Sequence, residues 1–540
     1  MGNEKFNLID ENWIKAVDEN CRLREVSIRE FFRNAHTYSE FCGETVSQDF
    51  AVMRMLLAIL HTAVERYDTD GNEHDFFDQD PIDVWMSIWS EGKFSEKQIG
   101  KYLDEWHERF YLFHEKYPFY QVPEMPFPKT KTKPKMIRQM DVEVSESDNK
   151  PRMFSGKSET EKQFLRYPEV ARSLIHYQNF SDCSQKCQNG RTADSAGNQL
   201  GWCGRISPVF AVGRNLFETL MLNLMLEVPA AEQHENRPVW ERNIPDNRED
   251  ISISFPDNLA ELYTMQSRRI KLLDAGDDVR YFYTTYGEIP SVDDAVGREP
   301  MTFFSVNKKG NLCVRRVTKD NKNVQSWRNF PFAINYIDDG AKGIVRKRPL
   351  IADWLHKLVN CTDTIPIVFF RTVSVSYGKV DGCIDDICQD EIVFSSGLFN
   401  DGEEVKLVQV MKEINLIDKV AYRIKLYVND LAAAEGTLSD EGTANPKLLN
   451  DIIADYYREI NEPFLYFLRH FNGEEDEIDN WHRETRDIVL DRAKFMAKSC
   501  SRAAYIGRYT DKDEKKAEIM TAPLALLRFQ RDIARLYGKQ

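Results

Sequence analysis

Three cysteines that lie close together in the sequence are the first candidates for chemistry. Cys183, Cys187 and Cys203 could supply three thiolates to a structural zinc ion, which takes four ligands in a tetrahedron. The fourth ligand would have to be His176 or a residue far away in the chain, because no second pair of cysteines lies near these three. The sequence leaves open whether this region binds zinc, and no metal site is predicted.

Catalytic motifs are otherwise absent or incomplete. His74 and Asp75 resemble half of a metal-dependent phosphohydrolase site, but no second His/Asp pair accompanies them. The Gly-Lys-Ser run at 156–158 matches the end of a phosphate-binding P-loop, yet Pro151 stands where the first glycine is required. No G-x-S-x-G, H-E-x-x-H or G-x-G-x-x-G motif is present. We therefore expect a protein that is not an enzyme and has no cofactor, with a metal-dependent nuclease or another enzyme as the alternative.

Two basic segments could instead contact phosphates. In KTKTKPK at 129–135, lysine alternates with Thr and Pro, which keeps the charge extended. Residues 491–540 hold twelve Lys and Arg against six Asp and Glu, and three of these cations recur every four residues, as on one helical face. The alternative for both segments is a solvated surface. The candidate phosphate contacts are Lys129, Lys131, Lys133, Lys135, Lys494, Lys498 and Arg502.

Composition limits the class of protein. A net charge of -15 argues against a protein that coats nucleic acid, so any nucleic-acid contact must be local. No run of eighteen apolar residues occurs, and the N-terminus lacks the basic-then-apolar layout of a secretory signal. Ten cysteines among 540 residues fit reduced thiols better than a disulfide framework. We expect a cytoplasmic protein without a membrane segment.

The elements that must position these groups are mixed in type over the first 390 residues. Helical periodicity predicts a core stripe from Phe50 to Leu60 and an aromatic helix from Leu103 to Tyr117, which Pro118 would stop. A helix over 169–180 precedes an aperiodic segment of about two dozen residues. Asn215 and Glu218 then form a predicted capping box that opens another helix.

Strand periodicity replaces helical periodicity between about residues 250 and 377. Predicted strands include VRYFYTTY, a hairpin around 307–310 and IPIVFFRTVSVSY, with a helix at 348–359 between them. We expect the strands to end beyond Asp385. Four helical segments follow, near 403–435, 445–471, 477–507 and 514–537. The predicted fold class is α+β, with a mixed α/β domain at 1–390 and a four-helix bundle at 396–540.

Several uncommon strings, in this order, resemble the CasA family, the large subunit of the type I-E CRISPR surveillance complex Cascade. They are FNLIDENWI near the start, RFYLFHEKYPFYQVP at 109–123, GWCGRISPVFAVGRNLFETLMLNL at 201–224, YTMQSRRIKLL at 263–273 and FRTVSVSYG at 370–378. The resemblance covers most of the first 390 residues. The terminal bundle matches in position and helix count only.

This resemblance implies a non-catalytic subunit that recognises the protospacer-adjacent motif in double-stranded target DNA and helps to open the duplex for guide-RNA pairing. It implies as partners the guide-RNA-bound Cascade subunits, namely the backbone, small and guide-end subunits, and a recruited helicase-nuclease. Base pairing would supply the sequence specificity, so the protein needs only a short-motif reader, a wedge and some phosphate contacts. An enzyme of antiviral defence remains the alternative. The bases of the motif and the guide sequence are not predictable from the chain.

The same resemblance implies roles for three loops. Phe154 corresponds to the aromatic of the family's first loop, which takes part in anchoring and DNA binding. Ser184 stands about where the family's glycine-rich motif-reading loop has its first glycine, and Lys379 and Val380 replace the glutamine expected at the tip of the wedge loop. The implied DNA-binding residues are Phe154, Ser184, Gln185, Lys186, Tyr377, Gly378, Lys379, Val380 and Asp381.

One family residue has no counterpart at the expected position. A lysine that reaches into the minor groove should lie near 286–290, but YGEIP contains none. Lys308 and Lys309 in the nearby hairpin are possible substitutes.

Overall fold

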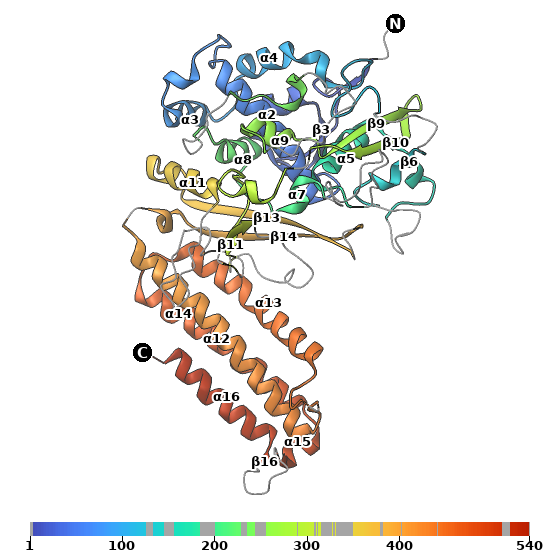
Figure 1. Cartoon of the computed structure of the whole chain (residues 1–540). Coiled ribbons are helices and arrows are strands. Elements are labelled where there is room, and N and C mark those ends of the chain that lie inside the picture. Colours follow the sequence, from blue (N-terminus) through green and yellow to red (C-terminus); the bar gives the residue numbers. More distant parts are fainter. Residues whose placement is uncertain are drawn as a thin grey trace. The chain divides into compact units, whose positions relative to one another are not determined.

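The computed structural model of the chain divides into two compact units (Figure 1). The first comprises residues 1–322, 335–358 and 369–391, and the second comprises 323–334, 359–368 and 392–540. The residues that the structure describes are 4–125, 133–144, 156–183, 200–227, 235–242, 255–288, 290–306, 309, 311–314, 327, 330, 349–378, 382–400, 402–439, 441–509 and 519–538.

The first unit is built around helix α2 (Val46–Arg66), with the other helices and short sheets around it (Figure 1). Thr45 begins α2 as its N-cap, because its side chain accepts a hydrogen bond from the Gln48 N–H group. The predicted apolar stripe from Phe50 to Leu60 is buried, which confirms it as core. Arg54 is buried too, so α2 is enclosed on all sides and packs against α9, α5 and α4.

The other described helices before residue 362 are shorter than α2. Asn215 is confirmed as an N-cap, because its Oδ1 atom accepts a hydrogen bond of 2.9 Å from the Glu218 N–H group. The Glu218 side chain accepts from the Arg214 N–H group at 2.8 Å instead of completing the predicted capping box. These helices are α1 (Ile28–Asn34), α3 (Pro81–Glu91), α4 (Glu96–Glu105), α5 (Tyr167–Phe180), α7 (Trp202–Arg205), α8 (Leu216–Asn223), α9 (Leu259–Thr264) and α11 (Leu350–Cys361).

The strands form several small sheets rather than one large one. Those described before the bundle pair in the orders β1-β5, β3-β2-β4, β6-β10-β7 with β9 on β10, β11-β12 and β14-β13-β8. The strands are β1 (Lys5–Asn7), β2 (Ile14–Asp18), β3 (Leu23–Val26), β4 (Tyr38–Phe41), β5 (Tyr111–Phe113), β6 (Lys135–Met136), β7 (Leu165–Arg166), β8 (Val209–Ala211), β9 (Arg268–Asp274), β10 (Asp278–Tyr286), β11 (Phe304–Val306), β12 (Leu312–Val314), β13 (Ile367–Tyr377) and β14 (Ile384–Ser395).

The predicted aromatic helix from Leu103 to Tyr117 is wrong. Helix α4 ends at Glu105, a 3-10 turn follows, and β5 pairs with β1 so that Phe113 lies opposite Lys5. Pairing with the N-terminal strand therefore outweighs the three- and four-residue spacing of the rings, because tertiary context overrides a local pattern. Phe110 is nevertheless fully buried, so the segment does supply the core.

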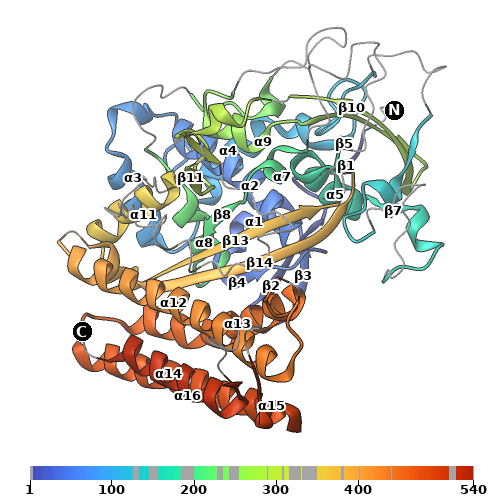
Figure 2. The same cartoon turned by 60° about the horizontal axis from the view of Figure 1, so that its bottom comes forward.

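The prediction that strands end beyond Asp385 is also wrong. Strand β14 runs for twelve residues from Ile384 to Ser395 beside β13, and the two are the long strands of Figure 2. Polar residues are common on a strand at the edge of its described sheet, since the outer edge of such a strand faces water. The polar sequence IDDICQDE therefore hid the strand from a search for apolar alternation.

The second unit contains the predicted helical bundle, which completes an α+β fold. Trp327, from an earlier part of the chain, is buried in this unit with its ring centroid 4.8 Å from that of Phe464. The helices are α12 (Glu404–Glu435), α13 (Pro446–His470), α14 (Glu475–Ser499), α15 (Arg502–Ile506) and α16 (Ala522–Tyr537), and a small sheet joins β15 (Arg508–Tyr509) to β16 (Ile519–Met520). Within the described part of the chain, no helix is long and apolar enough to cross a membrane.

Candidate nucleic-acid interface

The loop between α5 and α7 starts and ends at one place. Ser184, Gln185 and Lys186 lie outside the described residues, but both ends of their loop are described. The Gly201 N–H group donates to the Ser181 carbonyl oxygen at 2.9 Å, which closes the base of the loop. Arg268 also donates to the Asp182 carbonyl oxygen at 3.0 Å. The two described ends of the loop therefore meet at a fixed base.

Two glycines make this base compact. A Cβ atom on Gly201 would lie 2.6 Å from the backbone of Asn179, and one on Gly204 would lie 2.2 Å from the Tyr377 hydroxyl oxygen. A side chain at Gly201 would therefore clash with the backbone, and one at Gly204 would require the Tyr377 side chain to move. The two glycines of the Gly-Trp-Cys-Gly string at 201–204 are the sequence signal for this packing, but no packing was predicted from them.

A buried ion pair stabilises the α7 end of the same loop base. The Trp202 Nε1–H group donates to Glu299 at 2.7 Å, and Glu299 pairs with Arg54 at 3.0 Å. The side chains of Arg54 and Glu299 are both 0% exposed. The Arg54 guanidinium also lies 4.6 Å from the centroid of the Tyr263 ring. Sequence reasoning missed this pair, because 245 residues separate its members and neither belongs to a motif.

The turn between β13 and β14 has an equally defined base. Lys379, Val380 and Asp381 lie outside the described residues. On the near side of the turn, the Gly378 N–H group donates to the Cys383 carbonyl oxygen at 2.8 Å. Tyr377 is only 4% exposed, and its hydroxyl group donates to the Phe180 carbonyl oxygen at 2.8 Å. The Tyr377 side chain therefore points into the unit and supports the turn instead of extending from its tip.

The base of the first loop carries a half-buried lysine. Phe154 itself lies outside the described residues, as does all of 145–155. Just after this segment, the Lys157 ammonium group pairs with Asp141 at 2.8 Å and Glu143 at 3.0 Å. Burial would lower the pKa of Lys157, but the two carboxylates raise it above its ordinary value. Lys157 is therefore committed to a structural ion pair and not to a phosphate.

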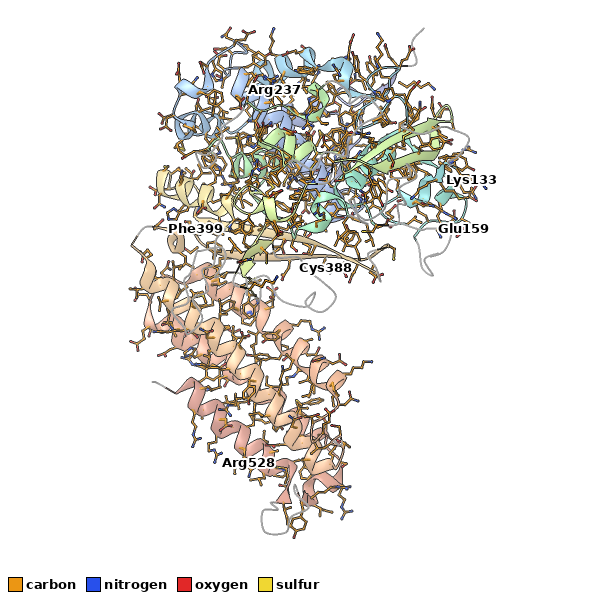
Figure 3. All side chains as sticks on the ribbon, viewed as in Figure 1. Lys133, Glu159, Arg237, Cys388, Phe399 and Arg528 are labelled. Carbon is orange, nitrogen blue, oxygen red and sulfur yellow. The ribbon has the colours of Figure 1, made fainter. Side chains whose placement is uncertain are left out.

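The basic segment at 129–135 is described in part. Lys129 and Lys131 lie outside the described residues. Lys133 is exposed and lies at the edge of the first unit in Figure 3, while Lys135 is half-buried in β6 opposite Phe282. In the hairpin of β11 and β12, Lys309 is exposed and Lys308 is outside the described residues. Only Lys133 and Lys309 of these candidates are thus described as surface cations.

The three basic residues of the bundle are all exposed, but they do not lie on one helical face as predicted. Helix α14 ends at Ser499, and Arg502 begins a separate helix, α15. The break has a local cause, because the side chains of Ser499 and Cys500 donate to carbonyl oxygens of the preceding turn and Cys500 has an extended backbone. Lys494 and Lys498 remain on one face, and Lys494 pairs with Asp491 at 2.9 Å.

The described members of the candidate metal sites have structural roles. The His176 Nε2 atom hydrogen-bonds to Ser47 at 3.0 Å, and burial lowers the pKa of His176 to about 3. The Cys203 thiol donates to Asn179, and burial raises its pKa to about 12. The His74 ring nitrogens contact a carbonyl oxygen and a glutamine amide. Among the described residues, no group of three His, Cys, Asp or Glu side chains could hold a metal ion.

Comparison with known proteins identifies relatives in sequence. A sequence model of the family described as CRISPR-associated protein Cse1 matches residues 7–492. A curated relative from Thermus thermophilus, CRISPR-associated protein CasA/Cse1, is 31% identical over 340 residues. That alignment spans 61% of this chain and 60% of the relative's length.

Solved structures share the fold over nearly the whole chain. Cse1 from Thermobifida fusca has a TM-score of 0.80 at 23% identity, with 98% of each chain covered. CasA (Cse1) from Thermus thermophilus has a TM-score of 0.70 at 22% identity, covering 99% of this chain and 100% of that one. A chain of a CRISPR RNA-guided surveillance complex has a TM-score of 0.67 at 15% identity, covering 98% and 99%.

Proposed function

The chain belongs to the Cse1 (CasA) family, and from that membership we propose that it is the large, non-catalytic subunit of a type I-E CRISPR RNA-guided surveillance complex. In this role it recognises the protospacer-adjacent motif in double-stranded DNA and helps to open the duplex beside it. It then takes part in recruiting the helicase-nuclease. Its other partners are the guide RNA and the subunits that carry it.

The observation that best supports this role is the hydrogen bond of 2.8 Å between Tyr377 and the Phe180 carbonyl oxygen. It joins the end of α5, just before the motif loop (near residues 183–187), to the start of the wedge loop (residues 377–382). The first base pair to be opened adjoins the motif, so a motif reader and a wedge must be neighbours on the protein. Two loops with linked bases meet that requirement.

The charge of the chain fits this division of work. Guide-RNA pairing reads the target, so the protein needs only local phosphate contacts and a net charge of -15 is acceptable. We propose the basic arm (residues 129–135) as one such contact and the exposed cations of the bundle as another. Lys309 is the described candidate for the family's groove-reading lysine.

The alternative function, a metal-dependent nuclease, is favoured by no contact among the described residues. His74 and Cys203 are held in hydrogen bonds within the fold, as described above. Metal analysis and a nuclease assay of the purified chain test this alternative directly. DNA cleavage by the isolated chain would contradict the proposed non-catalytic role.

The test of the proposed function separates charge from geometry in the reconstituted complex. Neutralising Lys129, Lys131, Lys133 and Lys135 should weaken binding of motif-bearing and motif-free duplexes alike, in a way that added salt mimics. Replacing Lys379 and Val380 by glycine should leave duplex capture nearly intact but slow strand opening, because the loop has lost the side chains that unstack a base step.

Pre-melted DNA distinguishes the two defects. A target with the first few base pairs beside the motif already unpaired should rescue the wedge-loop variant but not the arm variant. Equal rescue of both variants, or rescue of neither, would show that the loop at residues 377–382 is not the wedge.

A further inference from the structure

Tyr377 occupies a joint between segments that are 197 residues apart in the chain. It is the last residue of β13, and α5, α7 and β13 lie next to one another in both views of the fold (Figure 1, Figure 2). Its hydroxyl group reaches the carbonyl oxygen of Phe180, the last residue of α5. The final carbonyl groups of a helix have no partner within the helix, so a buried one needs an outside donor. Tyr377 is that donor for α5.

The α7 side of the joint is rigid. A Cβ atom on Gly204 would lie 2.2 Å from the Tyr377 hydroxyl oxygen and 3.0 Å from the adjacent ring carbon, so the tyrosine rests directly on the α7 backbone. That backbone is fixed in turn, because the Trp202 N–H group donates to Ser267 at 3.1 Å and its indole donates to buried Glu299 at 2.7 Å. Moving this segment would leave buried polar groups without hydrogen-bond partners, which is unfavourable.

The strand side of the joint leads directly to the wedge loop. Only Gly378 separates Tyr377 from Lys379, the first of the two candidate residues at the tip of the loop. The Gly378 N–H group is bonded to Cys383 at 2.8 Å, and a Cβ atom on Gly378 would lie 2.9 Å from Asp385 Oδ1 and Cys383 Sγ. The turn therefore has little freedom of its own at this end. A displacement of Tyr377 would pass to the loop.

We infer that Tyr377 is a positioning residue that couples the motif loop to the wedge loop. It holds the start of the wedge loop at a fixed place relative to the α5–α7 segment, so that seating the motif loop on its DNA motif also aims the wedge loop at the neighbouring base pair. This inference rests on the proposed function. Tyr377 acts through the two loops and touches no DNA, because its side chain is buried.

The first test uses the free chain and a matched pair of variants. Tyr377→Phe removes only the hydroxyl group and keeps the ring on Gly204. Tyr427→Phe is the control, because the Tyr427 hydroxyl donates to the Ala493 carbonyl oxygen at the same 2.8 Å and Tyr427 is 2% exposed, but both residues belong to the bundle. The two variants should lose similar stability, because each loses one buried hydrogen bond of the same length.

Amide hydrogen exchange then reports on the joint. In Tyr377→Phe, the amides of Gly201 and Gly378 should both exchange faster, by about three- to tenfold, because each closes the base of one loop. In Tyr427→Phe, both should exchange as in the wild type. Unchanged exchange at Gly201 in Tyr377→Phe would overturn the inference, since the two loop bases would then be independent.

The second test measures strand opening in the reconstituted complex with a fluorescent base beside the motif. Tyr377→Phe should capture motif-bearing duplex within about twofold of the wild type, but open it about three- to tenfold more slowly. The ratio of the opening rate of motif-bearing duplex to that of motif-free duplex should fall by the same factor. A merely structural role would leave that ratio unchanged, as we expect for Tyr427→Phe.

The outcomes separate the inference from the function on which it rests. A wild-type complex that shows no motif-dependent opening would contradict the proposed function. A wild-type complex that opens the duplex, with Tyr377→Phe equal to Tyr427→Phe, would contradict the inference alone.

A third variant approaches the joint from the other side. Gly204→Ala would place a methyl group against the Tyr377 hydroxyl, and should slow opening as Tyr377→Phe does. Because the shortest contact, at 2.2 Å, is to the hydroxyl oxygen itself, the two changes together should cost less than the sum of the single changes. Strict additivity would show that the two residues do not act through one joint.

Discussion

Each of the two units contains buried polar contacts, but the residues that these contacts join lie much farther apart in the sequence in the first unit than in the bundle. In the first unit, buried polar groups join residues far apart in the chain, with separations of 245 residues for Arg54 and Glu299 and 197 for Tyr377 and Phe180. In the bundle, the corresponding ties are between helices close in sequence. The hydroxyl of Tyr456 reaches Ile417 over 39 residues, and the indole of Trp481 reaches Glu413 over 68.

This difference explains why one unit was predicted better than the other. A helical bundle whose contacts link nearby helices shows its fold in local periodicity. The candidate interface of the first unit is assembled from loop bases that meet only after distant segments pack. The predictions below test whether the two units differ in this way, from the largest expected effect to the smallest.

The bundle should fold without the rest of the chain, because its contacts are mostly its own. A fragment of residues 396–540 should be helical and melt cooperatively. It lacks Trp327, whose indole donates to Asn461 at 3.1 Å, so it should be less stable than the second unit of the full chain by about 3–5 kcal/mol. Circular dichroism melts measure both properties.

The companion variant for this prediction is Trp327→Ala in the full chain. It should lower the melting transition of the second unit by a similar amount and leave that of the first unit unchanged. A fragment without cooperative melting would instead show that the bundle depends on residues before 396.

Breaking the buried ion pair should unfold the first unit selectively. Arg54→Leu leaves the Glu299 carboxylate buried without its charge partner, which typically costs about 3–5 kcal/mol. Urea unfolding should show the loss in the first unit's transition only. Arg214→Leu is the matched control, because the Arg214 side chain is 83% exposed in its pair with Glu218 and such pairs contribute about 0–1 kcal/mol. Equal losses of stability in Arg54→Leu and Arg214→Leu would contradict the inference that burial makes the pair of Arg54 and Glu299 the more important one.

Two neighbouring carboxylates should give the first unit opposite responses to pH. Burial, opposed by a hydrogen bond from Gly43, raises the pKa of Asp49 from 3.8 to about 7. The folded state therefore holds an extra proton between these values, and stability falls as the pH rises through this window. Burial would also raise the pKa of Glu44, but Arg172 and Lys15 lower it from 4.5 to about 2, so its contribution is lost as the pH falls below 4.5.

Variants of each carboxylate check these windows by urea unfolding at a series of pH values. Asp49→Asn should flatten the decline between about pH 4 and pH 7 and leave the acid limb unchanged. Glu44→Gln should affect mainly the limb below pH 4.5. If Asp49→Asn shifts the acid limb instead, Asp49 is ionised in the folded protein at neutral pH.

The smallest effect should come from the exposed cations of the bundle. Replacing Lys494, Lys498 and Arg502 by alanine should weaken target binding about equally for all sequences, and reduce the slope of log K against log salt by about one unit per lost contact. Arg502→Ala alone should lower this slope whether or not Lys494 and Lys498 are also replaced, because Arg502 lies on a different helix. A change in motif preference would contradict contacts made through phosphates only.

The sequence alone determined the elements whose signals are local. The burial of α2, the cap at Asn215, the strands of the β9–β14 region up to Tyr377 and the bundle helices all follow from periodicity or capping within a few residues. The family resemblance, carried by strings such as GWCGRISPVF, was likewise readable from the chain and agrees with the family match.

Only the tertiary structure decided the features that depend on a distant partner. The rings between Leu103 and Tyr117 have helical spacing, but pairing of β5 with β1 made part of that segment a strand. Strand β14 is polar because it lies at the edge of its described sheet, so its alternation is weak. The helix through Lys498 stops at Ser499, where side chains bind the last turn.

Tyr377 shows the limit most clearly. In the sequence it stands at the start of a loop with an implied role in DNA binding, and nothing nearby indicates which way its side chain points. The Tyr377 side chain is directed by the Phe180 carbonyl group at the end of α5, which accepts its hydrogen bond, and by the lack of a side chain at Gly204. Both residues lie more than 170 positions earlier in the chain. A hydrogen bond between such distant segments leaves no periodic trace in the sequence, because it forms only once the core has brought them together.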